Sequence, residues 1–236
     1  MSTMLKIQEN CVVKLKEWEQ RWHDNRIGFH RPHVHKMLES KIEKALAGRT
    51  GVRFFFPLCG KAVDMKWLAD MGHSVVGVEI SEKAIQQFFS ENDLTYSEET
   101  VPAIPGAKVF KNSEKNITLY NCDLYSLTSS IIGQFGAIWD RASMVAINPR
   151  DRVKYASLMI SLMANDCKYL LSTFMYNAEL YKGTPFVVTG EQVYTLFGEK
   201  CDVEKLLSEN LTGDRLQAWG VDYVIEELYL ITLKMS

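Results

Sequence analysis

Residues 57–61 are the first segment whose composition could do chemistry. They end an apolar run, residues 52–57, that is typical of a buried strand, and Gly60 would let a ligand approach the backbone there. The helix expected next offers free N–H groups at its first turn. The segment lacks the G-x-G-x-x-G pattern of dinucleotide sites, which favours a cofactor without phosphates. The alternative is an ordinary strand-to-helix turn.

Glu79 ends a second apolar run, residues 74–79, and follows Gly60 by 79 − 60 = 19 residues. An acid about 20 residues after the glycine turn is typical of βαβ nucleoside sites, where it binds the ribose hydroxyls. A carboxylate there accepts two charge-assisted hydrogen bonds and would repel a 2′-phosphate. The alternative is a solvated charge at a strand end.

Two further strand ends carry polar residues. Asp123 could accept a hydrogen bond from the exocyclic amine of an adenine while Leu124 covers the ring, although Asp is also a common turn former. Arg141 follows the apolar residues 137–139 and Asp140, and its planar guanidinium could hold an anionic substrate. The alternative for the second site is a structural Asp140–Arg141 ion pair.

The elements that must position these residues alternate between strands and helices from residue 52 onward. The β-α-β-α order of residues 52–91 predicts a parallel sheet with right-handed crossovers. Residues 92–118 interrupt the alternation, a hairpin is expected over 108–122, and Asn148 should cap a helix that reaches about residue 165. A strand over 168–176 should follow, and residues 203–207 and 223–233 should form an antiparallel pair with no helix between them.

In an open parallel sheet, ligands bind beyond the carboxyl ends of the strands, where all four segments should meet. A nucleoside site without a phosphate loop points to S-adenosylmethionine as the cofactor, and the antiparallel strands at the C-terminus are typical of methyltransferase sheets. The fold class expected is therefore α/β: a doubly wound, mostly parallel, Rossmann-like methyltransferase sheet.

Composition excludes several classes of protein. The 236 residues contain 27 Lys+Arg and 29 Asp+Glu, a net charge of −2, which argues against a nucleic-acid partner. No apolar run approaches the roughly 18 residues of a membrane span, and residues 1–10 do not resemble a secretory signal. The five cysteines form no C-x-x-C pair, so we expect no metal site and a reducing, cytoplasmic location.

Long segments of the chain resemble the thiopurine S-methyltransferase family. They are Trp18-x-x-x-Trp22, Gly28-Phe29-His30, FFPLCGKAVDMKW at 55–67, GHSVVGVEIS at 72–81, Ile138-Trp139-Asp140-Arg141, VAINP at 145–149 and Trp219-Gly220. The resemblance implies methyl transfer from S-adenosylmethionine to aromatic and heterocyclic thiols by a cytosolic monomer. No linker or repeat divides the chain, so we expect one domain over residues 1–236, with residues 1–48 as a helical lid.

The resemblance also implies roles for individual residues. Trp18, Trp22 and Phe29 would cover the cofactor, although both tryptophans could equally pack an amphipathic helix against a core. The remaining expected cofactor contacts are Leu58 and Gly60 to the methionine part, Glu79 with Ile80 at the ribose, Asp123 and Leu124 at the adenine, and Arg141. The pair at 123–124 departs from the family's usual small polar and aliphatic residues. Phe29, Arg141 and Arg215 would face the thiol, with both arginines as the candidate catalytic residues.

The mechanism expected is an in-line displacement in which a thiolate attacks the sulfonium methyl group. A heteroaromatic thiol is largely ionised at neutral pH, so the enzyme needs a cation to hold the anion, together with alignment and exclusion of water. One alternative is an oxygen, nitrogen or selenium acceptor. Others are a noncatalytic nucleoside-binding or protein-binding relative and, less favoured because the glycine-rich turn is missing, a dinucleotide oxidoreductase.

Overall fold

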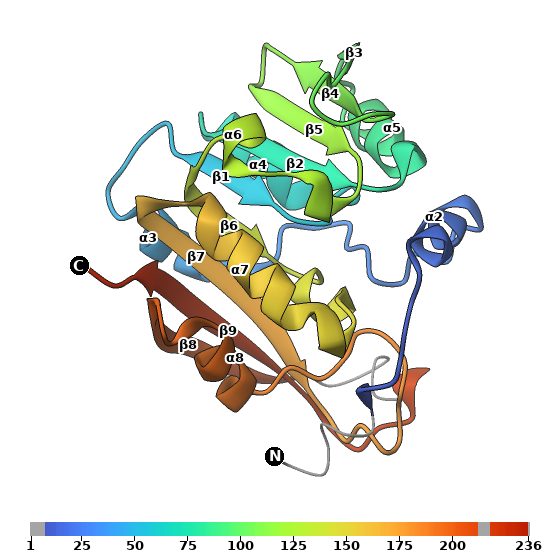
Figure 1. The fold of residues 1–236 in the computed structure, drawn as a ribbon, viewed down its shortest axis with the longest axis vertical. Helices are drawn as coiled ribbons and strands as arrows, with labels where there is room; N and C mark the ends of the chain where they lie inside the picture. The colour runs from blue at the N-terminus through green and yellow to red at the C-terminus, as the bar shows by residue number, and fades with distance from the viewer. Residues whose placement is uncertain (1–7, 212–217, 236) are drawn as a thin grey trace.

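A nine-stranded sheet organises the computed structural model, which describes residues 8–211 and 218–235. The strand order is β3-β4-β5-β2-β1-β6-β7-β9-β8 (Figure 1). The strands are β1 Arg53–Phe56, β2 Ser74–Glu79, β3 Ser97–Thr100, β4 Lys108–Asn112, β5 Ile117–Asn121, β6 Phe135–Asp140, β7 Met163–Met175, β8 Cys201–Leu211 and β9 Val224–Leu233.

The five central strands, from β5 to β7, are parallel, and the strands at both edges are antiparallel. At one edge β4 and β5 form the expected hairpin. At the other, β9 lies between β7 and β8 and runs antiparallel to both. The expected α/β class and the antiparallel pair at the C-terminus are therefore confirmed.

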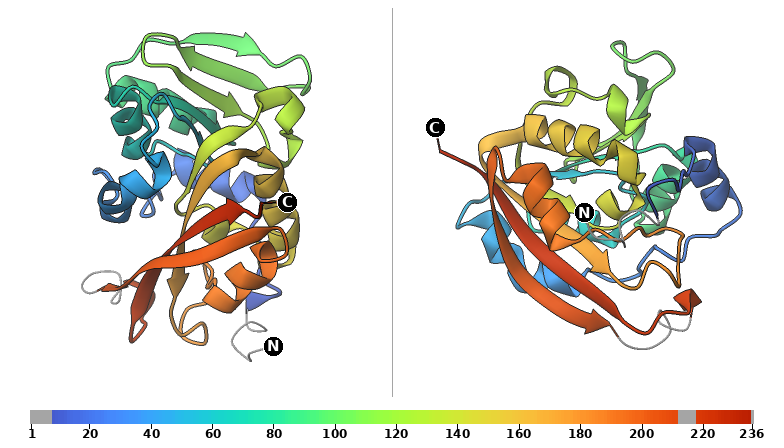
Figure 2. Two further views of the ribbon diagram at one scale, coloured as in Figure 1. Left: turned by 90° about the vertical axis from the view of Figure 1, so that its left-hand side faces the viewer. Right: turned by 60° about the horizontal axis from the view of Figure 1, so that its bottom comes forward.

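Helices cover both faces of the sheet (Figure 2). The helices are α2 Leu15–His23, α3 Lys36–Leu46, α4 Val63–Asp70, α5 Glu82–Glu91, α6 Ser129–Ile132, α7 Arg152–Leu162 and α8 Gly190–Phe197. One hydrophobic core takes Leu38, Leu68 and Phe88 from α3, α4 and α5, and the other takes Tyr155 and Phe197 from α7 and α8. No helix in the described part of the chain is long and apolar enough to cross a membrane.

Glycine is required at one point in the centre of the sheet. A Cβ on Gly77 of β2 would lie 2.7 Å from Cys59 Sγ and 2.8 Å from Leu119 Cδ2. Those distances are shorter than real contacts, so Gly77 lets the turn after β1 and the side chain from β5 pack against β2. The turn that begins the site is thereby seated on the neighbouring strand, where the Cys59 N–H also donates to the Val78 carbonyl at 2.9 Å.

Several element predictions need correction. Strand β3 and helices α6 and α8 were not expected, α7 ends at Leu162, and β7 begins at Met163 rather than at 168. Asn148 does not cap a helix through its side chain; a 3-10 turn over Pro149–Asp151 precedes α7. Residues 218 and 219 are helical, so the expectation of no helix between the last two strands is wrong. Propensity misses such short elements because their neighbours in the fold determine them.

Candidate active site

A cavity of about 640 Å³ lies at the carboxyl ends of the parallel strands. The turns after β1, β2, β5 and β6 form its floor, and residues of the 13–35 segment, α2 included, form its roof. The site residues predicted from the sequence that line this cavity are Trp18, Trp22, Phe29, Leu58, Gly60, Glu79, Ile80, Asp123, Leu124 and Arg141. Arg215 lies outside the described residues. The structure therefore brings together all ten of the predicted residues that it describes.

Glu79 is fixed by backbone groups at the end of β2. Its Oε2 accepts from the Gly60 N–H and its Oε1 from the Ser81 N–H, both at 2.9 Å. Asn121 Nδ2 donates to the carbonyls of Glu79 and Ile80 at 3.0 and 2.8 Å, which fixes the turn itself. Burial raises the pKa of the carboxyl to about 7, although the backbone N–H groups oppose the change. Glu79 is thus a buried, oriented hydrogen-bond acceptor.

Gly60 gives room to a side chain of the roof. Its φ is +51°, and a Cβ would lie 2.8 Å from Trp22 Cζ2. Because Gly60 has no Cβ, the Trp22 ring packs directly against its backbone, and Gly60 still lines the cavity where the sequence predicts that a ligand approaches. The preceding Leu58 also has a positive φ, +44°, which is unusual for a residue with a Cβ. The turn after β1 therefore depends on local backbone conformations that are held by its surroundings.

Three aromatic side chains form one cluster in the roof. The ring centroid of Phe29 lies 5.9 Å from that of Trp18 and 5.5 Å from that of Trp22, both in edge-on geometry. Trp22 is buried, whereas Trp18 and Phe29 are half-buried and line the cavity. The tryptophans therefore pack over the cavity, on Phe29 and Gly60, and neither belongs to the cores on the two faces of the sheet.

Arg141 and Asp140 have separate partners. Arg141 Nη1 donates to the Phe29 carbonyl at 2.7 Å, and burial lowers the pKa of its guanidinium. Asp140 is fully buried and its Oδ2 accepts from the hydroxyls of Tyr155 and Tyr169 at 2.6 and 2.7 Å. The alternative of an Asp140–Arg141 ion pair is therefore not observed. Asp140 anchors the end of β6, and Arg141 faces the roof.

A buried group of polar side chains near Arg141 was missed by sequence reasoning. Asp64 accepts from the His35 N–H at 2.8 Å and from Trp139 Nε1 at 3.1 Å. Glu226 Oε1 lies 3.2 Å from His35 Nε2 and accepts from Ser172 Oγ at 2.6 Å. Both carboxylates raise the pKa of Arg141, so they balance part of its charge. An acid inside the apolar run 224–233 was the signal that could have indicated this group.

Asp123 and Leu124 border the cavity where the chain leaves β5. Asp123 Oδ1 accepts from the Tyr125 N–H at 2.9 Å, and Asp123 begins a 3-10 turn over Leu124–Ser126. The interpretation of Asp123 as a turn former is therefore confirmed. Leu124 is buried beside it. Nearby, Asn148 Oδ1 accepts from the Val13 N–H at 2.8 Å, and its Nδ2 donates to the Val13 carbonyl at 3.3 Å. Asn148 therefore ties the roof segment to the floor.

Known proteins resemble this chain along nearly its full length. The family model "Thiopurine S-methyltransferase (TPMT)" matches residues 13–234. A probable thiopurine S-methyltransferase from Danio rerio is 55% identical over 227 residues, covering 96% of this chain and 98% of that protein. A thiopurine S-methyltransferase from Oryctolagus cuniculus is 48% identical over 228 residues, covering 97% and 93%.

Solved structures show the same fold at low sequence identity. A SAM-dependent methyltransferase from Anabaena variabilis has a TM-score of 0.66 at 14% identity and covers 99% of both chains. One from Geobacter sulfurreducens, in complex with S-adenosylhomocysteine, has a TM-score of 0.60 at 11% identity and covers 92% of this chain and 98% of that one. Because the family model matches residues 13–234, and relatives of that name are 48–55% identical over nearly the full length, this chain belongs to the thiopurine S-methyltransferase family.

Proposed function

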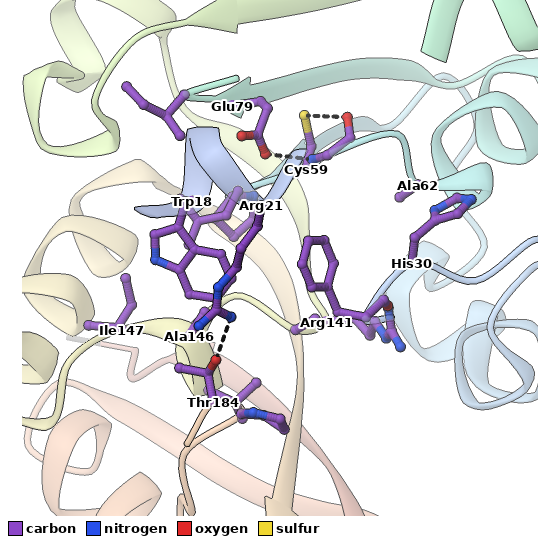
Figure 3. Close-up of a pocket in the computed structure, with 18 of the residues that line it drawn as sticks. Trp18, Arg21, His30, Cys59, Ala62, Glu79, Arg141, Ala146, Ile147 and Thr184 are labelled. Atoms are coloured by element: carbon purple, nitrogen blue, oxygen red, sulfur yellow. Dashed lines mark hydrogen bonds between the residues drawn. The ribbon is translucent and has the colours of Figure 1, made fainter. Parts of the chain in front are cut away.

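We propose that this protein transfers the methyl group of S-adenosylmethionine to aromatic and heterocyclic thiols such as thiopurines. The observation that carries the proposal is the pairing, in one cavity, of a buried carboxylate, Glu79, with a half-buried guanidinium, Arg141, beneath an aromatic roof (Figure 3). The Glu79 carboxylate can accept hydrogen bonds from the hydroxyls of a ribose, and the Arg141 guanidinium can pair with a delocalised anion. Family membership supports both assignments.

The cavity suits the cofactor in size and in chemistry. Its volume of about 640 Å³ is typical of small-molecule sites. Each Glu79 oxygen accepts one backbone N–H, which leaves lone pairs for the two ribose hydroxyls. Asp123 and Leu124 would hold the adenine, and Leu58 and Gly60 the methionine part. When bound, S-adenosylmethionine supplies an electrophilic methyl group on a sulfonium.

Arg141 would hold the acceptor in its anionic form. The guanidinium stays charged even where burial lowers its pKa, and its plane is weakly hydrated, so it can pair with a delocalised thiolate without protonating it. Arg215 would assist it, as the resemblance implies. Trp18 and Phe29 would exclude water, which strengthens the attraction and aligns the acceptor. Acidic thiols need no general base under this arrangement.

Substitution of both arginines tests the acceptor role. The double variant Arg141→Ala with Arg215→Ala should lose most turnover of acidic thiols, since the anion loses its cation, while S-adenosylhomocysteine still binds in calorimetry. A Lys44→Ala variant removes an exposed charge on α3, outside the lining of the cavity, and serves as the control. Unchanged turnover in the double variant would show that the arginines do not hold the anion.

The choice of sulfur is tested with a set of acceptors. Transfer of a tritiated methyl group to matched thiols, selenols, phenols and amines should be fastest for acidic thiols. A preference for phenols or amines would contradict the thiol assignment. Failure of S-adenosylmethionine to bind at high micromolar concentration would instead favour the noncatalytic alternative.

The cellular setting belongs to the same proposal. We infer a cytoplasmic monomer that acts in xenobiotic metabolism as one domain, in which residues 1–48 supply the lid through the part before α3, since α3 itself packs in a core of the sheet. The five cysteines are unpaired and four are buried, which supports a reducing compartment. The contacts of Trp22 and Phe29 over the cavity support the lid.

A further inference from the structure

A hydrogen bond joins the roof to a loop on the opposite side of the cavity. Arg21, on α2, directs Nη1 to Thr184 Oγ1 at 2.8 Å, across 163 residues of sequence (Figure 3). Thr184 lies between β7 and α8, and both residues line the cavity. Neither was singled out in the sequence, because an Arg on an amphipathic helix and a Thr in a loop are each ordinary on their own.

The same Arg21 begins a series of contacts that ends at Arg141. Its guanidinium carbon lies 4.5 Å from the centroid of the Trp18 ring, a cation–π contact. Trp18 packs edge-on against Phe29 at 5.9 Å, and the Phe29 carbonyl accepts from Arg141 Nη1 at 2.7 Å. Thr184, Arg21, Trp18, Phe29 and Arg141 therefore form a continuous chain of contacts, which we name the roof chain.

We propose that Arg21 and Thr184 are positioning residues that latch the roof over the cavity, and this inference rests on the function proposed above. Their bond must break before α2 can lift away from the 176–189 loop, so it retards release of the product cofactor. Through the roof chain it also holds the Phe29 carbonyl, and hence Arg141, in place for the acceptor. The Arg21–Thr184 hydrogen bond thus affects both the dissociation of the cofactor and the binding of the thiol.

The geometry favours a latch over a chance surface contact. Arg21 is half-buried, and its guanidinium is oriented by the Trp18 ring before it reaches Thr184, so little entropy is lost in making the bond. Two other contacts hold α2. Trp22 packs against Gly60, and Lys83 Nζ on α5 donates to the His23 carbonyl at 3.0 Å. The Thr184 bond attaches α2 to the other side of the cavity.

Thr184→Val removes the hydroxyl while keeping the shape of the side chain. Stopped-flow tryptophan fluorescence should show that S-adenosylhomocysteine leaves this variant about three- to tenfold faster than the wild type, as expected for one lost hydrogen bond. Thr184→Ser restores the hydroxyl and should restore the slow rate. Thr195→Val makes the same change on the exposed side of α8, away from the cavity, and should leave the rate unchanged. Equal release from wild type and Thr184→Val would overturn the latch.

A double-mutant cycle tests whether the two residues act as one. Arg21→Met keeps the stem over Trp18 and removes the donor, so Arg21→Met combined with Thr184→Val should accelerate release no more than Arg21→Met alone. The acceptor KM should rise in Arg21→Met while the unfolding midpoint stays near that of the wild type. Additive effects, or a lowered midpoint with an unchanged release rate, would show a merely structural role and overturn the proposal.

Ligand-free protein gives an independent measurement. Amide exchange of residues 15–23 should be faster in Thr184→Val than in the wild type, because α2 opens more often. Unchanged exchange there would count against the latch. The two proposals fail differently: if the wild type does not bind S-adenosylhomocysteine, the proposed function is wrong, whereas wild-type binding with no effect of Thr184→Val rejects only the latch.

Discussion

Burial of Glu79 disfavours its ionised form in the free protein. Its pKa rises from an ordinary 4.5 to about 7, so the folded chain binds this proton more tightly than the unfolded chain. The associated stability is fully present below about pH 4.5 and is lost as the pH rises through about 7, a loss of about 3 kcal/mol. Donors from a bound ribose would compensate for this loss. Above about pH 7, the ionised Glu79 carboxylate therefore destabilises the free protein, and hydrogen bonds from a bound ribose would stabilise it.

This environment predicts a pH dependence of cofactor binding. Ribose hydroxyls donate to the ionised carboxylate, so binding lowers the pKa of Glu79, and affinity must fall as the pH drops below about 7. We expect S-adenosylhomocysteine to bind about tenfold more weakly at pH 6 than at pH 8, as measured by calorimetry. Glu79→Gln should bind weakly and show a flat profile. A wild-type profile as flat as that of the variant would contradict the role of Glu79.

Gly60 predicts a second effect at this scale. Gly60→Ala introduces both the strain of a positive φ and a clash with Trp22, whereas Gly51→Ala, at φ +60° with nothing within 4 Å, introduces strain alone. Gly51→Ala should lose about 1–2 kcal/mol of unfolding free energy, and Gly60→Ala should lose more, because its Cβ would also meet the Trp22 ring. The Gly60 variant should also displace Trp22, shift tryptophan emission to the red and weaken S-adenosylhomocysteine binding. Equal binding by the two variants would contradict the packing of Trp22 on Gly60.

At the scale of elements, Asp140 joins β6 to its neighbours. The carboxylate at the end of β6 accepts from Tyr155 on α7, from Tyr169 on β7 and from the Met144 N–H at 3.0 Å. Burial raises the pKa of Asp140, and these donors oppose the change. A helix, a strand and a 3-10 turn are thus fixed to one carboxylate. The same group sets the direction in which the chain leaves β6 toward Arg141.

Removal of these donors should destabilise the fold. Tyr155→Phe and Tyr169→Phe should each lower the unfolding free energy by about 1.5–3 kcal/mol, the usual contribution of a hydrogen bond to a charged group. The double variant should lose more than the sum, because the buried carboxylate then has few donors left. Denaturant unfolding measures this, with Tyr194→Phe on the exposed face of α8 as the control. Losses equal to the control would contradict the role of Asp140.

The elements also show what the sequence could and could not predict. The apolar runs 52–57 and 74–79 predicted β1 and β2, and their ends predicted Gly60 and Glu79 in one cavity, because parallel strands bring their carboxyl ends together. Asn148 was read as a helix cap because the local pattern Asn-Pro-x-Asp is typical of one. Its side chain instead bonds to Asp151 and to Val13, which is 135 residues away, and no local pattern encodes the contact with Val13.

At the scale of the whole molecule, the two edges of the sheet are charged. All four residues of β3 are exposed, with Glu98 and Glu99 paired to Lys108 and Lys111 of β4 at 3.0 and 2.6 Å. The opposite edge strand, β8, exposes Asp202, Glu204, Lys205 and Glu209. Charged side chains on edge strands discourage pairing with another chain. The edges are therefore suited to a protein that does not associate through its sheet.

This arrangement predicts the oligomeric state. Sedimentation should give the mass of a single chain over a wide range of protein concentration. Glu99→Val with Glu204→Val removes one charge from each edge and should promote association, whereas Glu19→Val on α2 changes the charge away from both edges and should not. A wild-type dimer that survives dilution would contradict the prediction of a monomer.

The position of β9 has a consequence for the integrity of the cavity. Strands β7 and β8 are both paired to β9 and not to each other, so β8 joins the sheet through β9 alone. The bond between Ser172 on β7 and Glu226 on β9 crosses the β7–β9 seam, and the same Glu226 oxygen lies 3.2 Å from His35 Nε2. A break along this seam would therefore detach both C-terminal strands together and remove a carboxylate that balances the charge of Arg141.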